Sequence, residues 1–456
     1  MTMKQHDIRD NLPREHGFEP LKVEGQLPSY LKGTLFRNGP GISERFGAHF
    51  DHVFEADGAI SAVRFDGEQA QGAVRLVETP EYLEEKKEGR FLYGGQVSWL
   101  RRMLNTLRGK RKSPMNVNVM HWNGRLYALS DGAIPFALDK DNLAGLGEED
   151  FEGLVVGAHS AHPHWLESRR TLYNFSMIYG QKTEIEVYAF PVAERPQKIA
   201  RVPISGITYV HDFIVTEGHI VFFLSPVRVN VWRSLLQWGG LGEMLQWKPE
   251  FGTEIVIIPI DSPEKYTRFE TDPFFQWHFA NAFEQDGNIV VDYVRHRDFS
   301  TLSEINREEM ETKPEEKLHR AVVNPTQRSF ETFERWGGSC EFPSVSRNVT
   351  GQDAQYLWMV GFENERQGLV KVEAGTDRAT HVPVDKGQLV SEPIFVPRPG
   401  AVAEDDGAIL MLTYDDSSHR SFVGVYNGLA PEEGPQARVW FDHHIPTTFH
   451  GTWVDA

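Results

Sequence analysis

Short apolar runs bounded by turn residues dominate the hydrophobic pattern from about residue 117 to the end of the chain. Examples are RLYALSD (125–131), TLYNFSMIYG (171–180), HIVFFLSP (219–226), TEIVIIPI (253–260) and AILMLTYD (408–415). Several runs alternate apolar and polar positions, and Gly, Asn, Asp or Pro bounds most of them, as is typical of β-strands. Helical patterns do not alternate with these runs, so the sequence argues against a parallel βαβ sheet.

Many short strands in one chain indicate either stacked β-sandwiches or a β-propeller with four-stranded blades. The chain has no clean internal repeat, unlike propellers of the WD40 type. Its C-terminal sequence, FHGTWVDA, nevertheless favours a propeller. Chain ends usually fray, but a propeller closes its ring by pairing the two ends in one blade, and this would hold His450 at the central axis.

Composition and charge exclude several classes of function. The 456 residues are 40% hydrophobic and 12% aromatic, as in an ordinary globular protein. A net charge of −18 disfavours binding to nucleic acid. Cys340 is the only cysteine, which excludes an internal disulfide and indicates a reducing compartment. We expect neither a signal peptide nor a membrane-spanning helix, and a cytoplasmic location, because the N-terminus is polar and no apolar run approaches 18 residues.

Four of the eighteen histidines occur in similar settings, at His162, His211, His278 and His450. The gaps of 49, 67 and 172 residues are too wide for a zinc finger or an H-E-x-x-H helix. On a propeller axis each blade can contribute one inward histidine. Four imidazoles would leave Fe(II) with open positions for O₂, whereas zinc would form a closed structural site. Spacing alone also allows ordinary histidines here, and His159 and His164 compete with His162.

The sequences around these histidines are more specific than their spacing. They read AHPH (161–164), HDFIVT (211–216), HFANAFE (278–284) and FHGTWV (449–454), accompanied by FRNGPG (36–41), NGRLYALSDGAIPFALD (123–139), CEFPSVS (340–346) and SEPIFVPRPGAVAEDDG (391–407). The four histidine motifs, in their order along the chain, and the accompanying motifs resemble those of the carotenoid cleavage oxygenase family. The resemblance extends from roughly residue 30 to the C-terminus.

The resemblance implies an all-β fold, a seven-bladed β-propeller with helices or loops doming over the metal-bearing face. It implies a single domain over residues 1–456, of which 1–30 form an N-terminal extension. It also implies that Fe²⁺ is bound by His162, His211, His278 and His450. His159, His164, His443 and His444 are expected to be ordinary histidines.

Three carboxylates are expected behind these ligands, because metal-bound histidines usually donate their second N–H to an acid. Glu341 and Glu392 match two glutamates of the family, while the third position holds Asp131. Its side chain is one methylene shorter, so we expect contact with its histidine to need backbone movement or a bridging water. Ser130 stands where stilbene-cleaving relatives look as though they place a lysine, which argues against a lysine-assisted phenolate mechanism.

Two segments combine apolar and basic character. Trp99–Leu107 predicts an amphipathic helix whose apolar face is Trp99, Leu100, Met103, Leu104 and Leu107, with Arg and Lys around it. In an acidic protein such a helix suits an anionic membrane surface, although packing on the propeller explains it equally well. Val231–Trp247 carries three tryptophans and fits an interfacial patch, a tunnel lining or a buried part of the dome.

We therefore predict a non-haem Fe(II)-dependent dioxygenase that cleaves a C=C bond of a carotenoid or apocarotenoid into two carbonyl products. Peripheral membrane contact through the two segments would deliver the lipophilic polyene. One alternative keeps the chemistry and changes the substrate to a stilbene or a phenylpropenoid alkene. A propeller that binds a ligand without chemistry is a second alternative, and a non-oxygenative isomerase of the same family is a third. Neither a nucleic acid nor a protein partner is implied.

Overall fold

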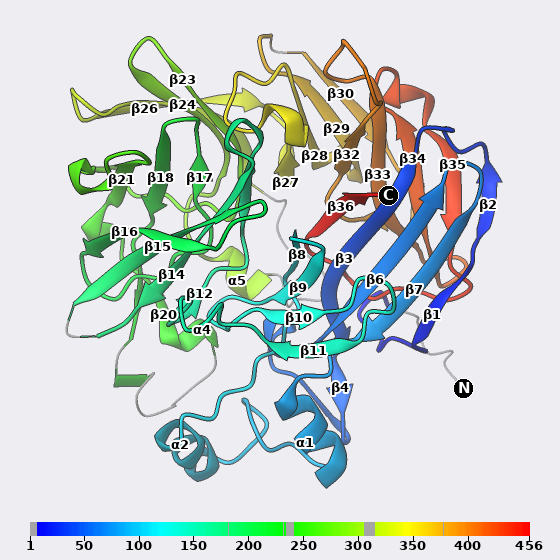
Figure 1. The fold of residues 1–456 in the computed structure, drawn as a ribbon, viewed down its shortest axis with the longest axis horizontal. Coiled ribbons are helices and arrows are strands. Elements are labelled where there is room, and N and C mark those ends of the chain that lie inside the picture. The colour runs from blue at the N-terminus through cyan, green and yellow to red at the C-terminus, as the bar shows by residue number, and fades with distance from the viewer. Residues whose placement is uncertain (1–6, 181, 231, 234–240, 305–314, 377) are drawn as a thin grey trace.

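Seven antiparallel sheets surround a common axis in the computed structural model, which describes residues 7–456 except 181, 231, 234–240, 305–314 and 377 (Figure 1). Each sheet is one blade of a β-propeller, and the innermost strands of most neighbouring blades contact one another. The predicted all-β, seven-bladed fold is confirmed.

The blades follow one another along the chain and are named here in that order, each from its inner strand outward. The first blade is β36 (Gly451–Asp455), β3 (Lys32–Ile42), β6 (Asp57–Asp66), β7 (Ala70–Leu76) and β1 (His16–Pro20). The second is β8 (Asn118–Trp122), β9 (Arg125–Leu129), β10 (Phe136–Leu138) and β11 (Gly145–Glu148). The third is β12 (Ala158–His159) with β13 (His164–Leu166), then β14 (Thr171–Ile178), β15 (Thr183–Pro191) and β16 (Gln197–Ile204). The fourth is β17 (Ile214–Val215), β18 (His219–Leu224), β21 (Thr253–Pro259) and β22 (Thr267–Thr271).

The last three blades have the same order of strands. The fifth is β23 (Phe279–Gln285), β24 (Asn288–Arg295), β25 (Lys317–Asn324) and β26 (Ser329–Trp336). The sixth is β27 (Ser339–Ser344), β28 (Tyr356–Glu363), β29 (Arg366–Glu373) and β30 (Ala379–Pro383). The seventh is β31 (Gln388–Val390) with β32 (Ile394–Pro397), then β33 (Gly407–Asp415), β34 (Arg420–Asn427), β35 (Pro435–Trp440) and β2 (Lys22–Gly25).

Both ends of the chain close the ring. The C-terminal β36 pairs with β3, with Gly451 opposite Arg37 and Asp455 opposite Gly33. The N-terminal strands β1 and β2 form the outer edges of the first and seventh blades. A Cβ added at Gly39 in β3 would lie 2.1 Å from the carbonyl oxygen of Thr447, so only glycine lets the C-terminal segment approach this strand.

Apolar clusters fill the interfaces between neighbouring blades throughout the described residues. Successive side chains of a strand point to opposite faces: on β28, Met359 packs toward the fifth blade and Trp358 toward the seventh, where it stacks on Phe395 with ring centroids 4.2 Å apart. Because both faces of a central strand are buried, several of the apolar runs are nearly continuous.

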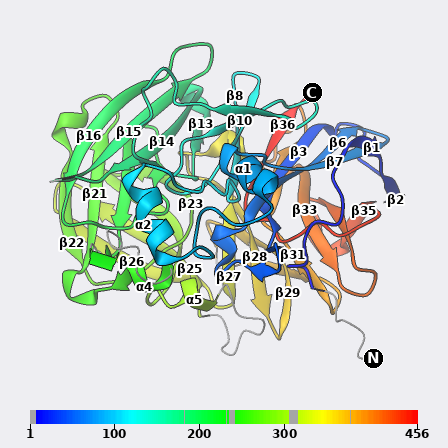
Figure 2. The same ribbon diagram turned by 90° about the horizontal axis from the view of Figure 1, so that it is seen from below.

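Helices α1 (Pro80–Glu88) and α2 (Trp99–Leu107) lie together at the lower edge of Figure 1 and in front of the strands in Figure 2. A buried ion cluster fastens this region to the first blade. Lys112 Nζ lies 2.8 Å from Asp57 Oδ1 and 3.2 Å from Glu85 Oε2. Arg45 Nη1 lies 2.8 Å from Asp57 Oδ2 and 3.2 Å from Glu85 Oε2. The two cations and two carboxylates thus compensate one another.

The two segments of mixed character have different structures. The predicted helix over Trp99–Leu107 is confirmed as α2. In Val231–Trp247, residues 231 and 234–240 lie outside the described residues. The rest includes a short helix, α4 (Leu241–Met244), and a strand, β20 (Leu245–Trp247), which pairs with β19 (Val227–Val229). Smaller elements are α5 (Thr301–Glu304) and the hairpin of β4 (Glu44–Arg45) and β5 (Ala48–His49). Among the described residues, no helix is long and apolar enough to span a bilayer.

Candidate metal centre

The four predicted histidines all lie next to innermost strands. His162 is in the turn between β12 and β13, and His211 comes three residues before β17. His278 directly precedes β23, and His450 directly precedes β36. Innermost strands border the propeller axis, so these four blades direct one imidazole each toward the same place.

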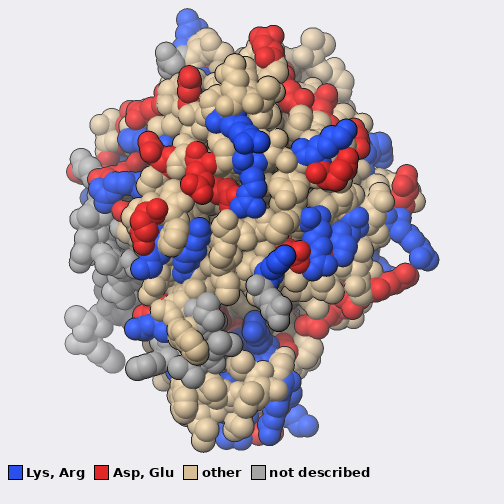
Figure 3. All heavy atoms as spheres, turned by 90° about the vertical axis from the view of Figure 1, so that its left-hand side faces the viewer, with Lys and Arg blue, Asp and Glu red and all other residues tan. Residues whose placement is uncertain are grey.

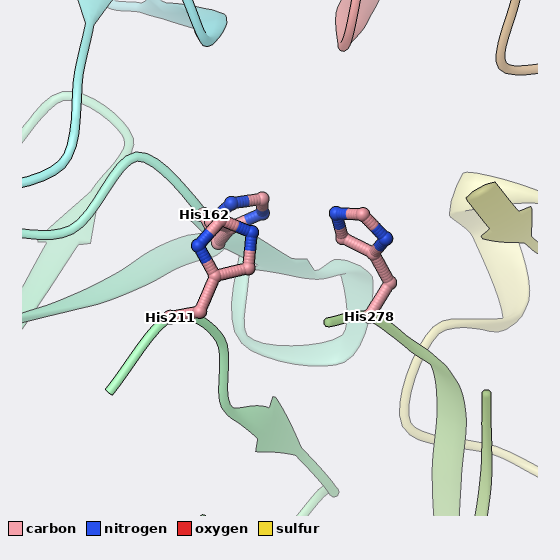
Figure 4. Close-up of side chains that lie close together, drawn as sticks. All are labelled: His162, His211 and His278. Carbon is pink, nitrogen blue, oxygen red and sulfur yellow. The ribbon is translucent and has the colours of Figure 1, made fainter. Parts of the chain in front are cut away.

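The four imidazole rings converge in the structure. One ring nitrogen from each of His162, His211 and His278 lies within 4.8 Å of the others, and all three side chains are buried (Figure 4). His450 joins them: its Nε2 lies 3.1 Å from Nε2 of His278, and its ring centroid is 4.8 Å from that of His162. Histidines far apart in the sequence therefore form one cluster of buried donor nitrogens.

Three of the rings donate Nδ1–H to a carboxylate from one of the remaining blades. The pairs are His211 with Asp131 of the second blade at 2.7 Å, His278 with Glu341 of the sixth at 2.6 Å, and His450 with Glu392 of the seventh at 2.9 Å. Each of these bonds fixes the tautomer that keeps the proton on Nδ1 and leaves a lone pair on Nε2.

Asp131 contacts its histidine directly at 2.7 Å, so of the two expected routes, backbone movement or a bridging water, the water is not needed. The turn after β9 brings the shorter side chain close enough, and the backbone N–H of Ala161 donates to Asp131 Oδ1 at 3.0 Å. This bond ties the turn to the loop that carries His162. The hydroxyl of Tyr209 also donates to Asp131 Oδ2, at 3.0 Å.

Each carboxylate is itself held by a residue that sequence reasoning did not single out. These residues are Tyr209 on Asp131, His296 on Glu341 with Nε2 2.8 Å from Oε1, and Arg37 on Glu392 with Nη1 3.1 Å from Oε2. The sequence does contain a trace of two of them, since Arg37 lies in the FRNGPG motif and Tyr209 lies two residues before His211. His296 ends an apolar run, and nothing local marks it.

Burial and these partners shift the pKa values in opposite directions. Burial, reinforced by the other three rings, lowers the pKa of His162 well below its usual range, so this ring is neutral. Burial also lowers the pKa of His278, but the charge and hydrogen bond of Glu341 outweigh it and raise the value overall. Burial disfavours ionisation of Glu341, yet contact with His278 and His296 holds the pKa of that carboxyl well below normal.

The unpaired atoms of the cluster fit a bound cation. In the neutral tautomers set by Glu341 and Glu392, the Nε2 lone pairs of His278 and His450 face each other at 3.1 Å. Nε2 of His162 is buried and has no hydrogen-bond partner among the described residues. Lone pairs directed at one another repel unless a proton or metal ion lies between them. Imidazole donors suit iron, zinc, copper and nickel.

The charges around the cluster also fit a bound cation. In the described part of the chain, a guanidinium or ammonium group contacts only one of the three carboxylates, through the Arg37–Glu392 pair. A divalent cation would balance the charges of the other two. The donor set and its surroundings therefore form a histidine metal site.

The other four histidines have separate partners. His159 bonds to Ser176 and Asn174, and His164 bonds to Asp212 at 2.8 Å. The ring of His443 contacts the backbone oxygen of His444. The ring of His444 contacts the backbone oxygen of Asp10. These contacts agree with their expected roles as ordinary histidines.

A cavity of about 560 Å³ adjoins the histidine cluster. Asp131 and Tyr209, which contact His211, line it together with Phe54, Val117 and Leu302. It also reaches α2, where Arg102 and Asn105 line it. The cavity thus connects the helical region with the surroundings of His211.

Comparison with known proteins gives one family. The family model described as retinal pigment epithelial membrane protein (RPE65) matches residues 10–455. The chain is 29% identical to the apocarotenoid-15,15'-oxygenase of Synechocystis sp., over 97% of this chain and 94% of that protein. It is 24% identical to resveratrol cleavage oxygenase 1 of Aspergillus fumigatus, over 97% and 93%, and 23% identical to isoeugenol monooxygenase of Pseudomonas putida, over 95% and 94%.

The solved structures agree with the sequence matches. The crystal structure of the cobalt-substituted Synechocystis ACO superposes with a TM-score of 0.91 at 28% identity, covering 98% of each chain. These matches confirm the family and enzyme class predicted from the motifs. The chain belongs to the RPE65 family of carotenoid cleavage oxygenases and is an alkene-cleaving oxygenase.

Proposed function

We propose that the protein binds Fe(II) through His162, His211, His278 and His450 and cleaves a C=C bond of a carotenoid or apocarotenoid with O₂, giving two carbonyl products. The observation that carries this proposal is the convergence of four buried rings, two of which oppose their Nε2 lone pairs at 3.1 Å. Ferrous iron, when bound, would supply a binding position for O₂ and the electrons that activate it.

The protein's own groups prepare the site. Asp131, Glu341 and Glu392 keep the protons on Nδ1, so that three Nε2 lone pairs face the centre. Aromatic rings exclude water from the histidine rings. Trp277 packs edge-on against His211 with ring centroids 4.7 Å apart, and Phe342 stacks on His278 with ring centroids 5.2 Å apart. A dry surrounding protects reactive oxygen chemistry from side reactions.

Two observations favour a polyene over a phenolic alkene. Ser130, which lines the cavity, cannot act as the lysine that stilbene-cleaving relatives look as though they place at this position. The apocarotenoid-cleaving relative is also more similar to this chain, at 29% identity, than the resveratrol- and isoeugenol-cleaving relatives, at 24% and 23%.

Helix α2 supports peripheral membrane contact as the source of a lipophilic substrate. Trp99, Leu100, Leu104 and Leu107 on its outer face are exposed, Leu107 by 79%. The lower end of the molecule in Figure 3, where α2 lies, shows mostly uncharged atoms flanked by Lys and Arg. The inner residues Arg102 and Asn105 line the cavity. The helix therefore separates the cavity from the surface on which a bilayer would lie.

The catalytic proposal is tested by metal content and product identity in the same preparation. The iron-loaded enzyme is incubated separately with apocarotenals and phenylpropenoids, and the aldehydes are identified by mass spectrometry. Replacement of His450 by Ala should remove iron and activity together, whereas His219→Ala, which alters a partly exposed histidine paired with Glu284, should retain both. Stoichiometric iron in the His450 variant would refute the four-histidine assignment.

Membrane contact is tested by co-sedimentation with vesicles that contain anionic lipid. Leu104→Glu should reduce the bound fraction, because it places a carboxylate on the proposed lipid-facing side of α2. Leu389→Glu is the matched control, because Leu389 is 43% exposed, as Leu104 is, but lies in β31 of the seventh blade. Equal binding of the two variants would contradict the role of α2.

A further inference from the structure

Two oxygen atoms in the cavity wall lack hydrogen-bond partners. They are Oε2 of Glu55, at the end of the 3₁₀ turn Val53–Glu55, and Oε1 of Gln96, three residues before α2. Both atoms are buried, neither has a hydrogen-bond partner among the described residues, and both side chains line the cavity that reaches Asp131 and Tyr209. Leaving a buried polar atom unpaired is unfavourable, and a ligand group that pairs with it removes that cost.

The position of Glu55 is fixed relative to the metal centre. Its neighbour Phe54 also lines the cavity and packs on Phe449 with ring centroids 5.3 Å apart, and Phe449 directly precedes His450. The His52 ring accepts a hydrogen bond from the backbone N–H of Phe54, and the second nitrogen of that ring lies 3.0 Å from the carbonyl oxygen of Leu302. The turn is thus held from both sides.

The chemistry of the two side chains defines the missing group. Burial and the nearby charge of Asp51 raise the pKa of Glu55, against a hydrogen bond from Gln96 and the charges of Lys112 and Arg102. The bond from Gln96 brings the two side chains into contact and still leaves Glu55 Oε2 unpaired. A protonated carboxyl donates one hydrogen bond and accepts others. The Gln96 amide donates to the carbonyl oxygen of His49 at 3.4 Å, which leaves Oε1 as an acceptor.

A hydroxyl group pairs with both side chains when the carboxyl of Glu55 is protonated, because it then accepts from that carboxyl and donates to the amide oxygen of Gln96. A carbonyl has no hydrogen to donate, so it would leave the amide oxygen of Gln96 unpaired. We propose that Glu55 and Gln96 form a subsite for a hydroxyl group carried by the alkene substrate away from its reacting double bond. This inference rests on the proposed function and specifies its substrate further. Such a hydroxyl occurs on the ring of a hydroxylated apocarotenoid and on a phenol.

The test uses substrate pairs that differ only at this group. One pair is a β-apocarotenal with and without a hydroxyl on its ionone ring, and the other is resveratrol and its O-methyl ethers. The wild-type enzyme should prefer one hydroxylated compound, by roughly two- to tenfold in kcat/KM for each neutral hydrogen bond. The pair that shows the preference identifies the source of the hydroxyl.

Three variants assign the preference to the subsite. Glu55→Leu and Gln96→Leu should each lower the preference by two- to tenfold, while Glu55→Gln should keep it because an amide also donates and accepts. Thr106→Val is the matched control: Thr106 lines the same cavity, but its hydroxyl already donates to the carbonyl oxygen of Arg102 at 3.0 Å, so the preference should not change. An unchanged preference in both leucine variants would overturn the proposal and show that Glu55 and Gln96 satisfy each other.

A binding measurement separates failure of the subsite from failure of the proposed function. If the wild-type enzyme cleaves neither β-apocarotenal, polyene cleavage is refuted, and dissociation constants for both pairs are obtained from quenching of tryptophan fluorescence. Tighter binding of a hydroxylated compound that is lost in Glu55→Leu would still support the subsite. Equal dissociation constants within both pairs would overturn it.

Discussion

Replacing Glu341 by Gln tests whether a charge behind the histidines strengthens metal binding. Glu341 accepts from His278 Nδ1 at 2.6 Å and from the backbone N–H of Phe342 at 2.8 Å, and its other oxygen lies 2.8 Å from His296 Nε2. Glutamine keeps the size of the side chain and one acceptor oxygen but removes the negative charge. A hydrogen bond to a charged acceptor is about twice as strong as a neutral one.

The expected effect is a loss of metal affinity, together with some loss of stability in the metal-free protein, because contact with His278 and His296 holds the pKa of Glu341 well below normal. Loss of a carboxylate behind a histidine ligand usually weakens metal binding about 10- to 100-fold, or roughly 1.4–2.7 kcal/mol. The assay is competition for Fe(II) against a chelator under anaerobic conditions, with thermal unfolding of the metal-free protein followed in parallel. Weaker iron binding by a variant that still unfolds cooperatively when metal-free would match the expectation.

The chain contains a matched control in the pair of His219 and Glu284. Here too the carboxylate contacts a histidine Nδ1 at 2.8 Å, but the pair lies in the fourth and fifth blades away from the four rings and is partly exposed. Glu284→Gln should leave the dissociation constant of iron unchanged. Equal iron affinity in the Glu341 and Glu284 variants would refute the reasoning.

Three further predictions concern individual side chains. Arg37→Leu removes the guanidinium from the buried Glu392 and should cost about 3–5 kcal/mol of unfolding free energy, measured by denaturant titration; an unchanged midpoint would contradict this. Asp131→Glu should lower kcat without raising iron affinity, because Asp131 already lies 2.7 Å from His211 and a longer side chain must displace the ring or the turn. Tighter iron binding in that variant would show that the turn adapts. Burial lowers the pKa of His319 from 6.5 to about 4. The unfolded chain therefore takes up the proton first, and the free energy of unfolding falls as the pH drops from 6.5 to 4, by up to about 1.4 kcal/mol per pH unit. Urea unfolding across this pH range should show a smaller fall for His319→Gln.

The sequence predicted the middle strands of the blades better than their edges. Strands such as β14 and β33, eight and nine residues long, are buried on both faces and lie within the apolar-rich segments that the sequence shows. The first blade was missed because β3 contains Gly33, Gly39 and Pro40, residues that usually break strands. The innermost β12 and β17 are only two residues long and leave no periodic signal.

Only the site residues that lie in local motifs were predicted from the sequence. The four histidines and two glutamates lie in short sequences that identify them individually. The outer supports depend on how blades meet in space: Arg37 and Glu392 are 355 positions apart, and His296 and Glu341 are 45 apart. The direct contact of Asp131 depended on the path of a turn, which side-chain length alone does not determine.

Closure of the ring by β36 has a consequence for assembly of the donor set. The first blade takes its inner strand, β36, from the segment that directly follows His450, and this strand pairs with β3. The fourth ring therefore reaches the other three only when β36 docks on β3, so closure of the circle and completion of the donor set are one event. Truncation before position 450 would deprive the molecule of both its last donor ring and the strand that seals the circle.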